Sequence, residues 1–189
     1  MELDLLTGLA LHTQLHAKLV ALAQSTCASR SSVSLLLVDV DRMKDLNATR
    51  GFDQGDRFLQ VIAAILQLKF RDAGLIARIG GDEFVILLPG TQLDEACERA
   101  ERLRLAVYTE TSAFGNQTVT VSIGVATTPK DAQWLASDLL DLADLRLVVA
   151  KKRLFKARNR IWSGALPSVW NKSQERYHSW PTTHHQPEL

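Results

Sequence analysis

The chain has 189 residues, 46% of them hydrophobic, and its 22 basic and 21 acidic side chains nearly balance. This length suits one globular domain with its own core, and the near-neutral charge argues against a general polyanion binder, so we expect no nucleic-acid partner. No apolar run approaches the roughly eighteen residues that a membrane span requires, so we expect no membrane contact from this chain. With only two cysteines and no secretory signal, the chain is expected to be cytoplasmic.

The first third of the chain predicts a helix, a strand and a second helix. Leucines at helical spacing predict a helix over residues 9–27. The run VSLLLVDV, residues 33–40, is almost continuously apolar, which is typical of a central strand covered on both faces. A polar stretch over 41–56, with two glycines, is interpreted as a loop, and apolar periodicity predicts a helix over 56–70.

The sequence ARIGGDEFVILLPG predicts a β-hairpin, because two apolar runs flank a Gly-Gly pair. We expect a two-residue turn at Gly80 and Gly81, with positive φ at both positions. That register places Arg78 opposite Glu83, where the two can form a cross-strand ion pair. Asp82 then has no cation opposite it and needs a partner from elsewhere.

Three further elements follow the hairpin. Residues 92–108 keep apolar side chains on one helical face, with charges opposite. Residues 117–126 alternate strictly, with apolar side chains on one face and small or polar side chains on the other, which predicts a strand. Residues 132–155 predict a long helix that becomes strongly basic at its end.

The C-terminal part of the chain predicts one last short strand, NRIWS, and then loses its pattern. We therefore expect one domain over residues 1–163. Residues 164–189 mix prolines, polar residues and two tryptophans, and are expected to form a flexible tail.

Two carboxylates are candidates for a metal site. Asp39 ends the buried strand and Asp82 follows the hairpin turn, so they can meet if the two strands are neighbours. Mg²⁺ takes oxygen ligands and is often held by one or two carboxylates plus substrate phosphates, and the backbone carbonyl of Val40 can add a ligand. The alternative is that these acids at strand ends are merely solvated.

The stretch 41–56 collects amide, carboxylate, lysine and glycine residues before a helix N-terminus, where backbone N–H groups favour phosphate. Asn47 and Asp56 can read a guanine base, because a carboxylate accepts from its adjacent N1–H and amino donors. Taken singly, Asn47 is equally explained as a turn residue and Asp56 as a helix N-terminal acid.

Residues 151–160 carry six basic side chains and suggest an anionic ligand nearby. Cations near a helix C-terminus also stabilise the helix itself, so a structural explanation of each charge stays open.

Several motifs in order resemble the GGDEF family, the diguanylate cyclases. The resemblance covers roughly residues 4–162 and rests on these blocks: DLLTGL, LLLVDVDRMKDLN, GFDQGD, RIGGDEFVIL, VTVSIGVA, and ADLRLVVAK followed by RNRI. It implies an α+β fold (an α/β sandwich) whose central, mostly antiparallel sheet is flanked by helices, similar to adenylyl cyclase catalytic domains and polymerase palm domains. It also implies condensation of two GTP into cyclic di-GMP and two pyrophosphates by a transient homodimer holding one GTP per subunit.

The resemblance also implies roles for individual residues. The metal, Mg²⁺ or Mn²⁺, is expected at Asp39, Val40 and Asp82. Asp82 is a further candidate for helping to deprotonate the attacking hydroxyl, together with the catalytic candidates Glu83 and Lys44. The substrate-binding set implied by the family comprises Met43, Asn47, Asp56, Lys151 and Arg158.

The chain departs from the family pattern at several positions. Ala48 stands where the family usually has Asp, and Phe52 where it has His. Six residues separate Lys151 from Arg158, three more than the family commonly has.

A further departure concerns the family's product-inhibition site, an R-x-x-D motif just before the hairpin. The chain keeps the arginine as Arg71 but has Gly74 at the aspartate position, so we expect this degenerate inhibitory site to be lost or weak.

Two other functions stay open from the sequence. The domain can be a catalytically weak receptor for GTP or cyclic di-GMP, or a pure interaction domain. In each case we expect a bacterial cytoplasmic location, as the output domain of a longer, sensor-containing or membrane-linked parent.

Overall fold

A computed structural model describes residues 2–29, 31–113, 118–128, 133–151 and 159–164. Within these residues a six-stranded sheet has the order β1-β3-β4-β2-β5-β6. The four central strands pair antiparallel with one another, and the short edge strands β1 and β6 pair in parallel with β3 and β5. The expected mostly antiparallel sheet flanked by helices is therefore confirmed. Among the described residues no helix is both long and apolar enough to span a membrane.

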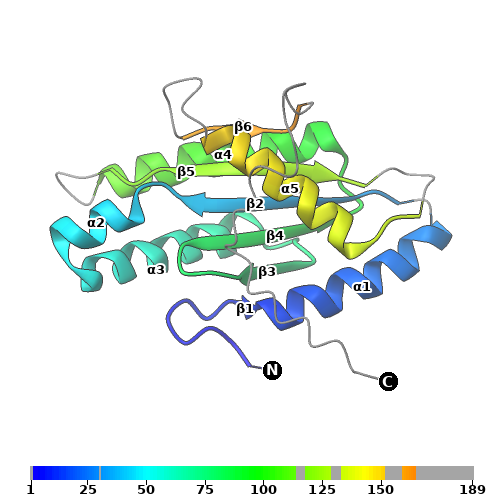
Figure 1. The fold of residues 1–189 in the computed structure, drawn as a ribbon, viewed down its shortest axis with the longest axis horizontal. Helices are drawn as coiled ribbons and strands as arrows, with labels where there is room; N and C mark the ends of the chain where they lie inside the picture. Colours follow the sequence, from blue (N-terminus) through cyan, green and yellow to red (C-terminus); the bar gives the residue numbers. More distant parts are fainter. Residues whose placement is uncertain (1, 30, 114–117, 129–132, 152–158, 165–189) are drawn as a thin grey trace.

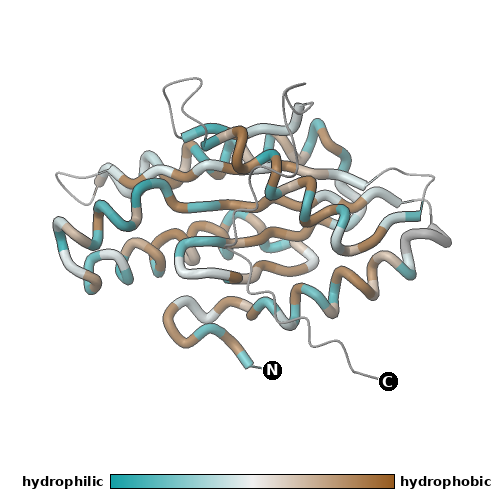
Figure 2. Tube along the Cα trace, viewed as in Figure 1, coloured by the Kyte–Doolittle hydropathy of each residue, from teal (hydrophilic) through white to brown (hydrophobic). Residues whose placement is uncertain are grey.

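Strand β2 (Val33–Val40) lies at the centre of the sheet, between β4 (Glu83–Pro89) and β5 (Val121–Thr127). All eight of its residues are buried, as expected for an apolar run covered on both faces. In Figure 2 the brown of hydrophobic residues runs along β2. The β2 strand thus matches the predicted bounds, whereas β5 begins four residues later than predicted.

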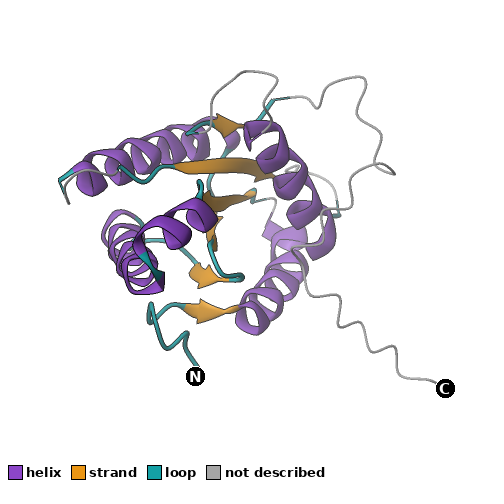
Figure 3. Ribbon diagram, turned by 60° about the vertical axis from the view of Figure 1, so that its left-hand side comes forward, coloured by secondary structure: helices purple, strands orange, loops and turns teal. Residues whose placement is uncertain are grey.

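Helices cover both faces of the sheet (Figures 1 and 3). On one face α3 (Phe52–Lys69) and α4 (Leu93–Ser112) pack against alternate residues of β2, β4 and β5. On the other, α1 (His12–Ser29) and α5 (Ala136–Lys151) cover the remaining positions.

Helix α5 approaches β5 very closely at Gly124. A Cβ at that position would lie 2.1 Å from the carbonyl oxygen of Ala143 and 2.5 Å from the nitrogen of Leu147. Only glycine permits this contact, and it brings the end of α5, with Lys151, over the end of β2.

Several predicted bounds are wrong at their ends. Residues Ala10–Leu11 form β1, paired with β3 (Leu75–Arg78), so the first helix begins only at His12. The predicted helices over 92–108 and 132–155 become α4 and α5 with other bounds; residue 132 and residues 152–155 lie outside the described residues. The short strand is present as β6 (Ile161–Trp162). The predicted tail lies almost entirely outside the described residues.

The stretch 41–56 is not a loop. It holds α2 (Met43–Arg50), and after Gly51 the next helix starts at Phe52 rather than at residue 56. Only Met43 and Leu46 of α2 are buried, which is too little to produce a periodic signal in the sequence.

The predicted hairpin register is also wrong. Arg78 lies opposite Phe84, and the N–H of Ile79 donates to the carbonyl of Glu83, so the turn includes Asp82. Neither Gly80 nor Gly81 has a positive φ. The N–H of Val40 also donates to the carbonyl oxygen of Asp82 at 3.0 Å, so the turn is attached to the end of β2.

Candidate active site

The predicted acids meet at the C-terminal end of β2. Asp39 lies directly opposite Glu83 of β4, so their side chains leave the sheet on the same face. Asp82 is brought to the same strand end by a backbone hydrogen bond, in which the N–H of Val40 donates to the carbonyl oxygen of Asp82. Arg78 lies opposite Phe84 instead, and its Nη1 lies 3.0 Å from Oδ1 of Asp4.

The Asp39 carboxylate is buried, and its two oxygens differ. Oδ2 lies 2.6 Å from Nζ of Lys151, which α5 brings over the strand end. Oδ1 is buried and has no hydrogen-bond partner in the described part of the chain. A buried carboxylate oxygen without a partner is costly, so we expect a group from outside the described residues to complete the hydrogen bonding of Oδ1.

Burial raises the pKa of the Asp39 carboxyl to about 7 and outweighs the ammonium of Lys151, which lowers it. The nearby carboxylates of Asp82 and Glu83 add to the rise. The excess of negative charge over positive charge is what a divalent cation would neutralise. No cluster of three acidic, histidine or cysteine side chains suited to a metal is formed among the described residues, and Mg²⁺ needs only one or two carboxylates besides substrate oxygens.

The predicted base-reading residues lie on the α2–α3 helix pair that follows β2. Asn47 projects toward α3, and its Oδ1 is buried without a hydrogen-bond partner among the described residues. A Cβ on Gly55 would lie only 2.0 Å from that oxygen. The absence of a side chain at Gly55 therefore makes room for Asn47. The neighbouring Asp56 is exposed.

Not all predicted residues gather at these two places. Lys44 is exposed on α2, whereas Met43 is buried beneath it, near Gly55. Arg158 lies outside the described residues. Phe52, which replaces the family's histidine, is 76% exposed at the start of α3.

The residues expected to form a degenerate inhibitory motif lie away from the acids, between α3 and β3. Arg71 is exposed, and a Cβ on Gly74 would lie 2.7 Å from Cγ of Pro89. Asp72 is held by both terminal nitrogens of Arg99, whose guanidinium also lies 5.0 Å from the centre of the Phe70 ring.

Two features of the site were missed by sequence reasoning. Gly55 is one of the two glycines in the stretch interpreted as a loop, and its close contact with Asn47 requires a glycine. Asp41, just past the predicted strand end, accepts three hydrogen bonds, from the hydroxyls of Thr120 and Ser122 and from the backbone N–H of Asn159. The i, i+2 spacing of Asp39 and Asp41 was the available signal, because it puts both side chains on one face of a strand.

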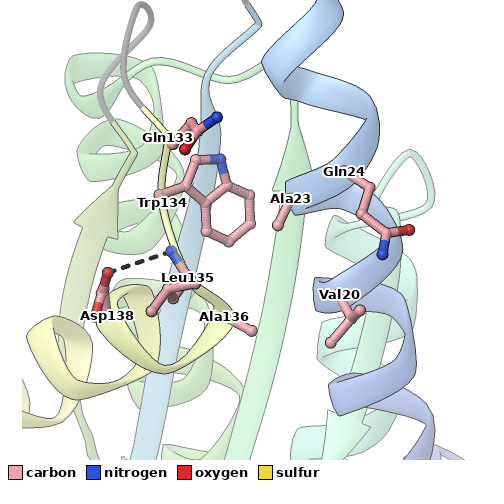
Figure 4. Close-up of a pocket in the computed structure, with 8 residues that line it drawn as sticks. All are labelled: Val20, Ala23, Gln24, Gln133, Trp134, Leu135, Ala136 and Asp138. Atoms are coloured by element: carbon pink, nitrogen blue, oxygen red, sulfur yellow. Dashed lines mark hydrogen bonds between the residues drawn. The ribbon is translucent and has the colours of Figure 1, made fainter.

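A cavity of about 620 Å³ lies elsewhere, between α1 and the start of α5 (Figure 4). Trp134 and Leu135 line it from one side and Val20 and Ala23 from the other, and the N–H of Leu135 donates to Asp138. None of the predicted site residues lines this cavity.

Comparison with known proteins gives a consistent result. The family model described as "Diguanylate cyclase, GGDEF domain" matches residues 1–157. The response regulator PleD of Caulobacter vibrioides is 39% identical over 129 residues, which are 66% of this chain and 28% of PleD. Diguanylate cyclase DgcM of Escherichia coli K12 is 40% identical over 123 residues, or 65% of this chain and 30% of DgcM.

A solved structure of diguanylate cyclase SiaD from Pseudomonas aeruginosa, in complex with its activator SiaC, superposes with a TM-score of 0.76 at 34% identity. The match covers 84% of this chain and 60% of that one. The chain spans less than a third of the length of the two curated relatives above. With the family model matching most of its length, the chain belongs to the GGDEF family of diguanylate cyclase domains.

Proposed function

We propose that this domain is a diguanylate cyclase that condenses two GTP into cyclic di-GMP and two pyrophosphates, as a dimer with one GTP per subunit. Family membership and the names of its relatives support the reaction. The observation that carries the proposal is the buried Oδ1 of Asp39, which has no hydrogen-bond partner among the described residues and lies beside two further carboxylates at the end of β2.

In this proposal Asp39 and Asp82, with the carbonyl of Val40, hold Mg²⁺ or Mn²⁺. The orphaned oxygen and the uncompensated negative charge both fit a divalent cation. When bound, the ion supplies neutralisation of phosphate charge. Lys151 already lies at the same carboxylate, so it is placed to contact phosphate oxygens held there.

The remaining roles belong to the protein's own side chains. Asn47 and Asp56 bind the guanine edge, with Met43 packed beneath, and Asp82 accepts the proton of the attacking 3′-hydroxyl. That oxygen then bonds to the α-phosphorus of the other GTP, and the bond to pyrophosphate breaks. Glu83, Lys44 and Arg158 orient the phosphates.

We further propose that the product-inhibition site is not functional in this chain. Asp72 is already held by Arg99, and the Pro89 ring fills the space that a side chain at Gly74 would need. Gly74→Asp alone is therefore expected to leave product inhibition unchanged. Inhibition that strengthens in this variant would show that Pro89 can move and that the site is latent.

The direct test is incubation of the purified chain with GTP and Mg²⁺ at several protein concentrations, followed by separation of the nucleotides. A dimeric cyclase forms cyclic di-GMP with a steeper than linear dependence on protein concentration. GTP left unconsumed at every concentration would contradict the proposal.

One observation favours a second candidate function, a receptor for GTP or cyclic di-GMP with little turnover. The ammonium of Lys151 already occupies one oxygen of Asp39 and competes with a metal for it. The same incubation separates the two functions, since a receptor retains bound nucleotide without consuming it.

A further inference from the structure

The hairpin turn that carries Asp82 is held from two sides. On one side, the carbonyl oxygen of Asp82 accepts a hydrogen bond from the N–H of Val40. On the other, the carbonyl oxygen of Gly81 accepts a hydrogen bond of 2.7 Å from Nη2 of Arg78. That carbonyl belongs to the planar peptide group that joins Gly81 to Asp82, so the contact with Arg78 orients the backbone directly before Asp82.

Packing does not hold this part of the turn. Gly81 is exposed, and a Cβ at this position would meet no described atom within 4 Å. A peptide group in open space can rotate unless a donor or an acceptor holds it. The hydrogen bond from Arg78 is therefore the constraint that the structure shows on this side of Asp82.

The guanidinium of Arg78 is itself held by Asp4, near the start of the chain. Its Nη1 lies 3.0 Å from Oδ1 of Asp4, and the two side chains are only 13% and 21% exposed. The same Asp4 oxygen accepts hydrogen bonds from the N–H and the hydroxyl of Thr7, at 2.9 and 2.6 Å. Partial burial works to raise the pKa of the Asp4 carboxyl, but the hydrogen bonds from Thr7 and Arg78 outweigh it and lower the pKa, so Asp4 is ionised at neutral pH.

Asp4 is a fixed support because residues 4–9 form a closed turn. The N–H of Asp4 donates to the carbonyl of Leu9, and the N–H of Gly8, which has a φ of 69°, donates to the carbonyl of Asp4. Strand β1 follows at once and pairs with β3, with Leu11 opposite Arg78 (Figure 1). The N-terminal turn is thus attached to the strand that leads into the hairpin turn.

We propose that Arg78 is a positioning residue of the active site, which fixes the backbone before Asp82 while Asp4 holds its guanidinium in place. The inference rests on the proposed function, in which Asp82 holds the metal and accepts the proton of the attacking hydroxyl. Neither Asp4 nor Arg78 touches substrate or metal in this account. The turn at residues 4–9 then supports the active site, although it lies far from Asp82 in the sequence.

A purely structural explanation is that the Asp4–Arg78 pair only attaches β1 to the sheet. The variants Asp4→Ala, Arg78→Ala and their combination separate the two explanations. If Arg78 acts through Asp4, the double variant should lose no more turnover than either single variant. If the pair is only structural, each variant lowers the free energy of unfolding and leaves turnover per folded molecule unchanged.

Three further variants serve as controls. Asp4→Asn keeps an oxygen that accepts from Thr7 and Arg78, so it should restore most of the activity lost in Asp4→Ala. Thr7→Ala removes one hydroxyl contact of Asp4 and leaves Arg78 attached. Asp72→Ala removes another acid–arginine pair, with Arg99, at the end of β3 that lies away from the hairpin turn.

The first measurement is the initial rate with saturating GTP and Mg²⁺ at one protein concentration, divided by the folded fraction. Arg78→Ala and Asp4→Ala should lower kcat about tenfold, the effect of one lost charge-assisted hydrogen bond, and change KM for GTP by less than about threefold. Asp4→Asn, Thr7→Ala and Asp72→Ala should stay within about threefold of the wild-type kcat.

The second measurement does not depend on activity. It is the order parameter of the Asp82 amide from ¹⁵N relaxation, because this N–H belongs to the peptide group that Arg78 holds. The order parameter should be about 0.85 in the wild type, as in rigid backbone, and below about 0.6 in Arg78→Ala and Asp4→Ala.

Unchanged kcat in both alanine variants overturns the proposal, as do additive losses in the double variant or a Thr7→Ala variant as impaired as Asp4→Ala. A wild type that forms no product refutes the proposed cyclase instead. In that case the order parameter still decides whether Asp4 and Arg78 hold the turn, because equal order of the Asp82 amide in the wild type and in Asp4→Ala overturns it without reference to activity.

Discussion

The two ends of β2 differ in whether their buried polar groups have hydrogen-bond partners. At the first end, the hydroxyls of Ser32 and Ser34 both donate to the carbonyl of Thr91, and Val33 donates to the hydroxyl of Thr128. At the other end, Asp39 keeps a buried oxygen that no group in the described part of the chain satisfies. One strand thus carries both a completed hydrogen-bond network and an incomplete one.

The difference indicates that the Asp39 end of β2 serves a function in addition to stabilising the fold. Buried polar groups normally find partners, and unmatched carboxylates with a strongly shifted pKa concentrate at functional sites. Asp41 shows that this chain can satisfy a carboxylate at the very same end. Of these two aspartates, only Asp39 keeps an oxygen without a hydrogen-bond partner among the described residues. We infer that a ligand contacts this oxygen.

The largest expected effect is on turnover. Asp82→Ala should lower cyclic di-GMP formation by at least about a thousandfold, because it removes a metal ligand and a proton acceptor together. GTP binding should largely survive, measured by equilibrium dialysis. Asp94→Ala, an exposed acid at the start of α4, is the matched control and should be fully active. Unchanged product formation in Asp82→Ala would remove Asp82 from the site.

The second effect is on the pH dependence of stability, and it tests whether the Asp39 carboxylate is unsatisfied in the folded protein. Its pKa is raised on folding from 3.8 to about 7, so the folded state binds a proton more tightly and wild-type stability falls as pH rises through that window. Relative to Asp39→Asn, the wild type should lose about 2–3 kcal/mol of unfolding free energy between pH 5 and pH 8. Urea unfolding in EDTA measures this difference.

The opposite trend, with the wild type gaining relative stability at pH 8, would mean that the Lys151 pair dominates and that Asp39 is a structural ion pair. The contrast between the two strand ends would then disappear, because both would be satisfied internally.

The third effect is on specificity, in the helix pair that follows the acidic end. Asp56→Ala should reduce the preference for GTP over ATP by about 1–3 kcal/mol, the value of a lost bidentate base contact. Competition binding of the two nucleotides measures it. Asp53→Ala, an exposed acid in the first turn of the same helix, should keep the preference. Equal discrimination in both variants would place base recognition elsewhere.

The smallest expected effect is on stability, at the N-terminal end of β2, where the buried polar groups have hydrogen-bond partners. Ser34 donates to Thr91 and shares a hydrogen bond of 2.6 Å with Thr127. Ser34→Ala should cost about 1 kcal/mol of unfolding free energy, since the Thr91 carbonyl keeps Ser32 as a donor. Turnover per folded molecule should not change. A fall in turnover larger than the fall in folded fraction would show that the two ends of β2 are coupled.

Much of this contrast is local in the sequence. The apolar run over 33–40 predicts a strand covered on both faces because each of its residues must be buried. The alternation over 117–126 predicts which residues of β5 meet α4, and Val119, Val121, Ile123 and Val125 do lie in one core cluster. The apolar runs also predict where the strands end. The positions of Asp39 and Asp82 at strand ends are therefore predicted from the same local pattern.

The parts that were not predicted depend on distant contacts. The hairpin register goes with pairing to β2, including the bond from Val40 to Asp82, and no local pattern contains these long-range contacts. Helix α2 begins after Arg42, which has a φ of 61° and no capping side chain, so the usual start signal is missing. The attachment of Asn159 to Asp41 spans 118 residues and follows from the fold alone.

The most direct test of the central claim is a calorimetric titration of GTP into the wild type and into Asp39→Asn, each with Mg²⁺ and with EDTA. If the open end of β2 is a metal and nucleotide site, Mg²⁺ should tighten GTP binding to the wild type and have little effect on Asp39→Asn. The same gain from Mg²⁺ in both proteins would contradict the account, because the unpartnered oxygen of Asp39 would then have no part in holding the metal.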